Sequence, residues 1–270
     1  MENAKLDPVR MSLDKWEMYK ALKDMNVQKV HLPETGIATQ ENVIRFLNQF
    51  EKIYVKPVGT WGGRQIVRVR KQNRNFEWQE QGHAPITFKT EEALRERFTQ
   101  TYGESPSIVQ AAAPIRNLHG RLFDVRLLMQ RDVEDEWIQA GTVVRIGGKG
   151  SIVSNVEISR GEVVGFGTLC KRIRLSRQAR RQLEQRLKQT GLTICKALEE
   201  YRHFNEIGID FGLGNDNTLW IFEVNTDDTI GGPSHELFAK LTDKRLYKEI
   251  EARAAAVRDN TLKIFMEQLF

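Results

Sequence analysis

The sequence has few cysteines and no long apolar run, and each shortage excludes a class of protein. Its 270 residues include only two cysteines, Cys170 and Cys195. They are too few for a disulfide framework and lack the spacing of a metal site, so we expect buried, reduced thiols. No apolar run reaches the ~18 residues that a membrane span needs, and the first twenty residues lack the apolar stretch of a signal peptide. These absences predict a cytoplasmic protein that does not enter a membrane.

Low-complexity segments and internal repeats are absent as well, and so are the Ser/His/Asp or Cys/His arrangements of nucleophilic enzymes. The chain contains 41 basic and 36 acidic residues and has a net charge of +5. This balance favours anionic partners such as nucleotides, acidic peptides or nucleic acid, without selecting among them. The densest basic run, residues 171–189, is interpreted as a solvated helix face, with a site for an anionic partner as the alternative.

Apolar spacing along the chain predicts helices and strands in irregular alternation. Helices are expected over residues 12–25, 39–50 and 91–103, from Ser176 onward, and through most of the tail. In the first helix we expect Ser12 as the N-cap, and a core stripe of Trp16, Tyr19, Leu22 and Met25. Strands are expected over residues 52–58, 64–72, 107–115, 123–131 and 136–147. Antiparallel pairs are prominent, so an α+β protein of two lobes is predicted.

Two short apolar runs, residues 206–213 and 218–225, each contain one carboxylate. A tight turn between them is expected to place Asp210 opposite Ile221 and Gly208 opposite Glu223. Because side chains alternate between the faces of a strand, Asp210, Glu223 and Asn225 then share one face. The other face is expected to be core, formed by Ile207, Ile209, Phe211, Trp220, Phe222 and Val224.

This polar face predicts a cation site. Two carboxylates a few ångströms apart repel each other unless a cation or a shared proton lies between them. Two carboxylates, an amide oxygen and added phosphate oxygens are ligands that Mg²⁺ prefers. The alternative is a pair of exposed acidic residues on a half-solvated sheet, and a one-residue change of register would move Asp210 to the other face.

Basic side chains inside apolar strands indicate an anionic ligand. Lys56 precedes a proline in an otherwise apolar strand and needs an anionic partner, unless its side chain reaches solvent. Arg126 and Arg145 lie among apolar neighbours, where a guanidinium normally meets a carboxylate or a phosphate, and structural salt bridges are the alternative. Two roles stay open for Lys15, which either binds a phosphate or is a solvated helix residue. Two also stay open for Trp61, which either caps a ligand or packs against the protein.

The spacing of Asp210, Glu223 and Asn225 resembles the metal-binding signature of ATP-grasp enzymes such as D-alanine–D-alanine ligase. Other segments follow in the matching order, and the similarity extends over residues 12–232. The segments are LDKWEMYKAL, IYVKPVGTWGGRQIVRV, SIVQAAAPI, FDVRLLMQ, VVRIGGKGSIVSNVEISRGE and GIDFG. The last three, FDVRLLMQ, VVRIGGKGSIVSNVEISRGE and GIDFG, resemble the RimK-like branch, and most closely the YheC/YheD endospore coat-associated family.

This resemblance implies an ATP-grasp fold, in which two lobes with antiparallel sheets clamp a nucleotide. Residues 1–50 would form an N-terminal helical segment and residues 51–112 the small lobe. Residues 113–234 would form the large lobe with the metal site, and residues 235–270 a C-terminal helical tail. The N-terminal α/β domain that often precedes this fold is expected to be largely absent.

The same resemblance implies roles for individual residues. ATP would be bound by two lysines, a glycine loop and an inter-lobe strand, namely Lys15, Lys56, Gly59, Thr60, Gly62, Gly63, Gln110, Ala111 and Ala113. The transferred phosphate would be held by the catalytic residues Arg126, Arg145 and Asn155, with Asp124 orienting Arg126. Asp210, Glu223 and Asn225 would hold one or two Mg²⁺ ions, with Mn²⁺ as an alternative.

The implied function is that of an ATP-dependent carboxylate–amine ligase that forms an acyl-phosphate on a peptide, protein or amino acid. Its partners would be ATP and an unknown carboxylate substrate, such as an acidic peptide or protein. A second copy or a partner chain would complete the substrate site, and neither a membrane nor nucleic acid is expected. The alternative is a catalytically silent ATP-binding or spore-coat assembly protein. In either case, a cytoplasmic protein associated with the forming spore is expected.

Two departures from the family pattern bear on activity. The segment NTDDTIGG replaces the usual proline-containing turn after the metal-binding asparagine and adds Asp227 and Asp228. The segment SRGE stands where a glycine pair is common. We expect the two added carboxylates either to help bind the metal or to repel an acidic substrate.

Overall fold

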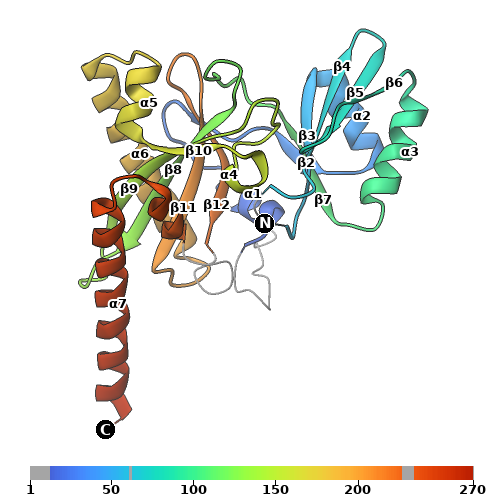
Figure 1. The fold of residues 1–270 in the computed structure, drawn as a ribbon. Helices are drawn as coiled ribbons and strands as arrows, with labels where there is room; N and C mark the ends of the chain where they lie inside the picture. Colours follow the sequence, from blue (N-terminus) through green and yellow to red (C-terminus); the bar gives the residue numbers. More distant parts are fainter. Residues whose placement is uncertain (1–12, 61–62, 227–233, 270) are drawn as a thin grey trace.

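The computed structural model describes residues 13–60, 63–226 and 234–269 of the chain. Their strands form two six-stranded sheets, one in each of two lobes that lie side by side (Figure 1). Nearly all neighbouring strands are antiparallel, and the exception is the parallel pair of β1 and β12. The α+β architecture with two lobes is therefore confirmed.

The smaller sheet has the strand order β2-β7-β3-β4-β5-β6. Its strands are β2 (Thr35–Ile37), β3 (Lys52–Pro57), β4 (Val67–Gln72), β5 (Asn75–Glu80), β6 (Ile86–Phe88) and β7 (Ser107–Ala111). Two helices, α2 (Gln40–Gln49) and α3 (Glu91–Tyr102), cover one face and bury an apolar core against it. Side chains alternate along β3 and β4, so the polar residues of these strands face the other lobe.

The larger sheet has the strand order β1-β12-β11-β8-β9-β10. Its strands are β1 (Val30–His31), β8 (Phe123–Arg131), β9 (Trp137–Ile146), β10 (Glu162–Gly165), β11 (Glu206–Leu213) and β12 (Leu219–Asn225). Helices α1 (Lys15–Leu22), α5 (Phe166–Arg172) and α6 (Arg177–Leu198) pack on the main core. On a smaller core lie the 3-10 helix η1 (Ser234–Lys240) and α7 (Arg245–Leu269), which projects from this lobe (Figure 1).

The N-terminal residues contribute to both cores. Helix α1 packs in the core of the larger sheet, whereas α2 packs on the smaller sheet. The predicted cap of α1 is wrong, because Asp14 accepts hydrogen bonds from the backbone N–H groups of Trp16 and Glu17, at 2.8 Å and 2.9 Å. The predicted stripe is also wrong in part, since Met18 and Leu22 are the buried residues of α1. Trp16 lies half-buried, as does Tyr19, with which it stacks.

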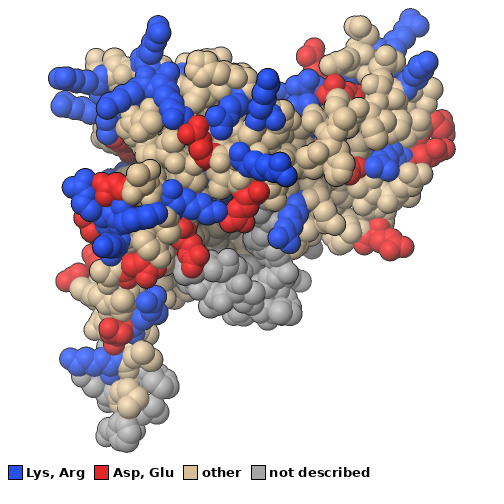
Figure 2. Space-filling view, in the orientation of Figure 1, with Lys and Arg blue, Asp and Glu red and all other residues tan. Residues whose placement is uncertain are grey.

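The long basic run forms the end of α5 and the beginning of α6. As predicted, Ser176 caps α6, and Leu183 and Leu187 face the core. Most of the basic side chains between residues 171 and 189 are exposed, and lysine and arginine gather over this part of the larger lobe in Figure 2. The solvated-face interpretation therefore agrees with the structure. Among the described helices, none combines the length and the apolar character that crossing a membrane requires.

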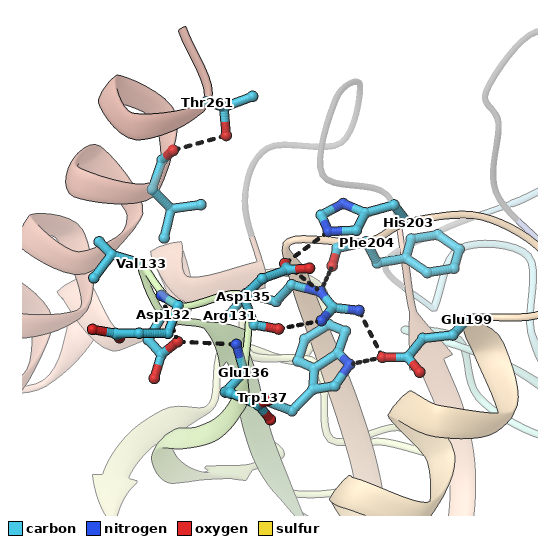
Figure 3. A network of polar contacts seen from close by, with 12 residues as sticks. Arg131, Asp132, Val133, Asp135, Glu136, Trp137, Glu199, His203, Phe204 and Thr261 are labelled. Carbon is cyan, nitrogen blue, oxygen red and sulfur yellow. Dashed lines mark hydrogen bonds and ion pairs between the residues drawn. The ribbon is translucent and has the colours of Figure 1, made fainter. Parts of the chain in front are cut away.

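A polar network fastens the far end of β8 to the neighbouring elements (Figure 3). Arg131 donates from Nε to the Phe204 carbonyl at 3.0 Å and from Nη2 to Glu199 Oε1 at 2.6 Å, and its guanidinium lies 4.5 Å from the centre of the Trp137 ring. The Trp137 ring N–H donates to the same Glu199 oxygen at 2.7 Å. The network connects the β8–β9 hairpin to the end of α6. It lies at the end of β8 that is remote from the cleft, and the first half of β8 forms part of the cleft.

Candidate active site in the cleft between the lobes

A cavity of about 1390 Å³ lies between the two sheets. Basic side chains outnumber acidic ones in its lining, which suits a ligand with several negative charges. The basic ones are Lys15, Lys52, Lys56, Arg64, Arg68, Arg70, Arg126, Arg145 and Lys240, and the acidic ones are Asp124, Glu157, Asp210, Glu223 and Glu236. The structure brings every described residue of the predicted site into this cavity. The remaining one, Gly62, lies outside the described residues, as do Trp61, Asp227 and Asp228.

The polar face of the β11–β12 hairpin forms by a different register from the predicted one. Asp210 lies opposite Glu223, and Gly208 lies opposite Asn225, whereas Phe211 lies opposite Ile221. Phe222 is thus an extra residue on β12, which makes a β-bulge. The bulge brings both Phe222 and Glu223 to the cavity.

The prediction that Asp210, Glu223 and Asn225 share a face agrees with this arrangement. The predicted core face of β12 is correct for Val224 but wrong for Trp220 and Phe222. The core residues of β12 are Leu219, Ile221 and Val224, because the bulge shifts the alternation by one residue. Phe222 is only half-buried and lies on the cleft side. A Cβ at Gly212 would come 2.3 Å from the Phe222 ring, so glycine leaves the room that this ring occupies.

Asp210 is buried and is held by two arginines. Arg126 forms a bidentate pair with it, in which Nη2 lies 2.8 Å from Oδ2 and Nε donates to Oδ1. Arg145 Nη2 lies 2.6 Å from the same Oδ2. Burial opposes ionisation, but the charges of Arg126 and Arg145 outweigh it and hold the pKa of Asp210 below its usual value.

Asp124 pairs with Arg145 and not with Arg126, so the expectation that it orients Arg126 is wrong. Two hydrogen bonds of 2.8 Å and 2.7 Å join the Arg145 guanidinium to the carboxylate, and Ser154 donates to it as well. Burial raises the pKa of the Asp124 carboxyl, against the charge of Arg145. Asp124, Arg145, Asp210 and Arg126 therefore form one chain of alternating charges across β8, β9 and β11. Structural ion pairs, the alternative left open by the sequence, are present at both arginines.

The two predicted phosphate-binding lysines approach the polar face of the hairpin from different sides. Lys15, the first residue of α1, lies 3.7 Å from Glu223 Oε1 and donates to the Thr60 carbonyl. Lys56 of β3 donates to Gln110 Oε1 at 2.6 Å, a neutral acceptor. Burial lowers the pKa of Lys56 to about 8, with Glu223 acting in the opposite direction.

The loop after β3 lies against the other lobe. Gly59, Thr60 and Gly63 line the cavity. Gly63 has a φ of +77°, and a Cβ there would come 3.2 Å from Ile158 Cδ1, so both its backbone and its surroundings favour glycine. Ile158 belongs to α4 (Val156–Ser159), a short helix. Asn155 caps α4 through its side-chain oxygen, which accepts from the backbone N–H of Glu157 at 3.0 Å.

The inter-lobe strand β7 contributes Gln110 and Ala111 to the cavity, and Ala113 lines it just after the strand ends. Both ends of the Gln110 amide are already in use, because its Oε1 accepts from Lys56 and its Nε2 donates to Thr35 Oγ1 at 3.0 Å. The Gln110 side chain is therefore a support for Lys56. Backbone groups and the small side chains of the two alanines are what this segment offers a ligand.

The predicted metal ligands form a set of oxygen donors that fits a hard cation. Asp210 and Glu223 are directly opposed, and Asn225 donates from Nδ2 to the Gly208 carbonyl at 3.3 Å, which leaves its Oδ1 as an acceptor. Within the described ranges no group of three or more His, Cys, Asp or Glu side chains is arranged to hold a metal. An ion here would need further ligands such as phosphate oxygens.

Sequence reasoning left out several residues of the cavity. Lys52, Arg68 and Arg70 line it from the smaller sheet, and Ser154 and Phe222 line it from the larger lobe. The alternation of KIYVKPV and IVRVRK contains the signal for the three cations, because every second residue in these segments is apolar and buried. The bulge at Phe222 has no comparable signal in a single sequence.

Two antiparallel sheets that face each other across a basic cleft, with paired carboxylates on a hairpin of one lobe, have the arrangement of the ATP-grasp fold. A family model for YheC/D-like ATP-grasp proteins matches residues 9–255, and the chain belongs to this family. The predicted ATP-grasp fold and the resemblance to the YheC/YheD family are thereby confirmed.

Two curated relatives come from Bacillus subtilis (strain 168). The endospore coat-associated protein YheD is 22% identical over 220 residues, which cover 79% of this chain and 48% of YheD. The endospore coat-associated protein YheC is 23% identical over 227 residues, which cover 79% of this chain and 59% of YheC. The chain thus spans about half the length of the curated relatives it matches.

Solved structures with a similar arrangement include two enzymes. One is an ADP complex of the N5-carboxyaminoimidazole ribonucleotide synthetase purK, with a TM-score of 0.46, 11% identity, and coverage of 81% of this chain and 46% of purK. The other is the ATP-grasp ligase PsnB with a minimal precursor, Mg and ADP, with a TM-score of 0.46, 12% identity, and coverage of 90% and 58%.

Proposed function

We propose that the protein is an ATP-dependent carboxylate–amine ligase. The observation that carries this proposal is Lys56, a half-buried lysine whose hydrogen-bond partner is a neutral amide and which faces the carboxylates of Asp210 and Glu223. A half-buried cation beside two carboxylates and a second lysine suits the phosphates and the cation of a bound nucleotide. Membership in an ATP-grasp family supports the same ligand.

The proposed reaction has two steps. A substrate carboxylate oxygen attacks the γ-phosphorus of ATP, which releases ADP and forms an acyl-phosphate. An amine then attacks the acyl carbon, phosphate leaves with the bonding electron pair, and the amine gives up a proton to form the amide. Neither step needs a covalent bond to the protein, which agrees with the lack of a nucleophilic triad in the sequence.

The residues of the cleft would act by charge and position. Lys15 and Lys56 would offset phosphate charge, and Arg126 and Arg145 would lie near the transferred group, with Asn155 at the end of α4 beside them. Asp210, Glu223 and Asn225 would hold Mg²⁺, which supplies charge neutralisation and in-line orientation when bound. For Asp210 to act as a ligand, one of its arginine partners must share or release an oxygen.

A catalytically silent nucleotide-binding protein is the second candidate. The ion pairs of Asp210 with two arginines favour it. Both carboxylate oxygens of Asp210 are bonded by arginines, an arrangement that stabilises the lobe without any metal. The relatives named as endospore coat-associated suggest a role in coat assembly for such a protein, and a location at the forming spore for either candidate.

Thermal unfolding with Mg·ATP tests nucleotide binding. A ligand at 100 times its Kd stabilises the folded state by about 2.7 kcal/mol, so the wild type should unfold at a higher temperature with Mg·ATP. Glu223→Ala should lose most of this shift, whereas the matched variant Glu96→Ala, at an exposed position on α3, should keep it. A wild type that shows no shift excludes both candidates.

ADP release across a panel of amino acids and acidic peptides separates the two candidates. A ligase should release ADP with a subset of carboxylates, and hydroxylamine should trap the acyl-phosphate as a hydroxamate. Binding of Mg·ATP without ADP release or hydroxamate for any member of the panel would favour the silent protein.

A further inference from the structure

The cleft face of the smaller sheet has three cations that the proposed nucleotide site does not use. Lys52 of β3 and Arg68 and Arg70 of β4 line the cavity, and we refer to them as the β3–β4 cation cluster. In the register of the sheet Lys52 lies opposite Arg70, and Tyr54 lies opposite Arg68. These residues alternate with buried apolar ones, so their side chains share the cleft side.

The charge of the cluster is only partly compensated. Glu77 of β5 lies 3.3 Å from Arg68 Nη2 and 3.7 Å from Arg70 Nη1, so one carboxylate serves two guanidinium groups. Burial lowers the pKa of Lys52, and so do the charges of Arg70 and Arg68. Three cations beside one carboxylate favour a further anion at this position.

Arg68 also has an unused donor. Its side chain is 14% exposed, and its Nε is buried with no hydrogen-bond partner among the described residues. A buried donor without an acceptor is unfavourable. The edge of a guanidinium that includes Nε is one that binds a carboxylate through two parallel hydrogen bonds.

The cluster is separate from the phosphate lysine but lies in the same cavity. Lys52 precedes Lys56 by four residues on the same face of β3, which corresponds to about 13 Å along a strand. The cavity of about 1390 Å³ is larger than the roughly 300–1,000 Å³ of most small-molecule sites. It therefore has room for a second extended ligand beside a nucleotide.

We propose that Lys52, Arg68 and Arg70 form an anion subsite for an acidic peptide substrate, and that they bind a carboxylate other than the one that is phosphorylated. The proposal rests on the proposed function and adds a substrate class to it. A carboxylate is favoured as the ligand because Glu77 already occupies part of the site with this group. Two arginines suit the bidentate geometry of carboxylates better than two lysines would.

Fluorescence anisotropy with a labelled hexaglutamate peptide tests the subsite on the full chain. The double variant Arg68→Gln/Arg70→Gln should bind the peptide at least about tenfold more weakly than the wild type. Its affinity for a Mg-bound, non-hydrolysable ATP analogue should stay within about twofold. Arg74→Gln is the matched control, because Arg74 is exposed in the β4–β5 turn outside the cavity.

Glu77→Gln gives a change in the opposite direction. It removes the internal carboxylate that competes for both arginines, so it should strengthen peptide binding severalfold. A purely structural role of the cluster does not predict this gain. A hexaglutamine peptide should show no dependence on any of these variants.

Three outcomes would overturn the subsite. The double variant could bind the peptide as tightly as the wild type does, or it could lose as much affinity for the nucleotide as for the peptide. Alternatively, the two substitutions could weaken the binding of tripolyphosphate and leave the binding of the peptide unchanged. Charge-dependent peptide binding by a protein that fails to bind Mg·ATP would support the subsite and exclude the ligase. Mg·ATP binding without peptide binding by the wild type would leave the ligase in place and exclude the subsite.

Discussion

Asp210 pairs with two arginines and also belongs to the proposed metal site. Its carboxylate is the nearest anion to Arg126 and also contacts Arg145, and it faces Glu223 across the hairpin. Removing one partner of a buried ion pair leaves an uncompensated charge, which is far more costly than losing an exposed pair. Substitutions at Asp210 and at Glu223 should therefore differ in stability, even though both residues belong to the proposed metal site.

We expect Asp210→Ala to lower the free energy of unfolding by about 3–5 kcal/mol, because Arg126 and Arg145 lose a buried partner. Glu223→Ala should lower it by less than about 1 kcal/mol, since this side chain is 30% exposed and its ion pair with Lys15 spans 3.7 Å. Urea unfolding of the two variants measures both values. Equal losses would contradict the assignment of Asp210 as the anchor of the arginines.

Lys56 should take up a proton when the nucleotide binds, and this uptake can be measured. Its pKa of about 8 reflects burial in the free protein, and phosphate charge would raise it again. At pH 8 about half of the Lys56 side chains are neutral, so binding of Mg·ADP should take up a fraction of a proton, and this uptake should vanish near pH 6.

Calorimetric titration in buffers of different ionisation enthalpy measures this uptake. Lys56→Arg is the control, because arginine keeps the positive charge and does not titrate at pH 8. Proton uptake that is the same in the wild type and in Lys56→Arg would show that another group titrates.

At the scale of the elements, the periodicity of apolar residues predicted most of the strands and helices. It did not predict the bulge in β12 or the pairing of charged side chains between strands. The alternation of residues 206–213 and 218–225 identified the hairpin and the face of Asp210. The bulge at Phe222 was not predictable, because its position depends on how Gly212 and the core residues pack and not on the pattern of β12 alone. The same limit applies to Arg126 and Asp124, whose partners are set by neighbouring strands that are remote in sequence.

The 3-10 helix η1 contains a buried histidine near its start, between two carboxylates. His235 Nδ1 lies 2.6 Å from Glu206 Oε2, and Nε2 lies 2.5 Å from Glu251 Oε1. Burial alone would lower the pKa of His235, but the hydrogen bonds and charges of Glu206 and Glu251 outweigh it and raise the pKa above 6.5. The contacts join η1 to β11 and to α7.

A histidine whose pKa is higher in the folded state than in the unfolded state stabilises the fold when it is protonated. This stabilisation is fully present at a pH below the unfolded-state pKa, and it is lost as the pH rises through the folded-state pKa. The amides of η1 and the first turns of α7 should therefore exchange more slowly with solvent, after correction for the intrinsic rate, at about pH 6 than above the raised pKa. Hydrogen exchange at several pH values measures this. His235→Gln should remove the pH dependence, and a dependence that persists in this variant would contradict the role of His235.

At the scale of the whole molecule, the order of the segments along the chain predicted the two lobes and the cleft between them. What the sequence did not predict is how the lobes touch. Gln81, just after β5, accepts through Oε1 from Ser151 Oγ at 2.9 Å and from the Ile152 N–H at 3.1 Å. Neither serine nor glutamine has a pattern that indicates such a contact, because it joins residues 70 positions apart.

These contacts should bias the molecule toward the closed cleft. Gln81→Ala removes both hydrogen bonds and a third one, from Gln81 Nε2 to the Ile158 carbonyl at 3.4 Å. Each is worth about 0.5–1.5 kcal/mol net, so the population of the closed form should fall by at least about tenfold relative to open forms. Because apparent affinity scales with the binding-competent fraction, Mg·ATP affinity should fall, and small-angle scattering should give a larger radius of gyration for the free protein. The matched variant Gln72→Ala, at an exposed position at the end of β4, should change neither quantity. Unchanged scattering and affinity in Gln81→Ala would mean that other contacts, such as the packing of Gly63 against Ile158 and the hydrogen bond from Lys15 to Thr60, hold the lobes together.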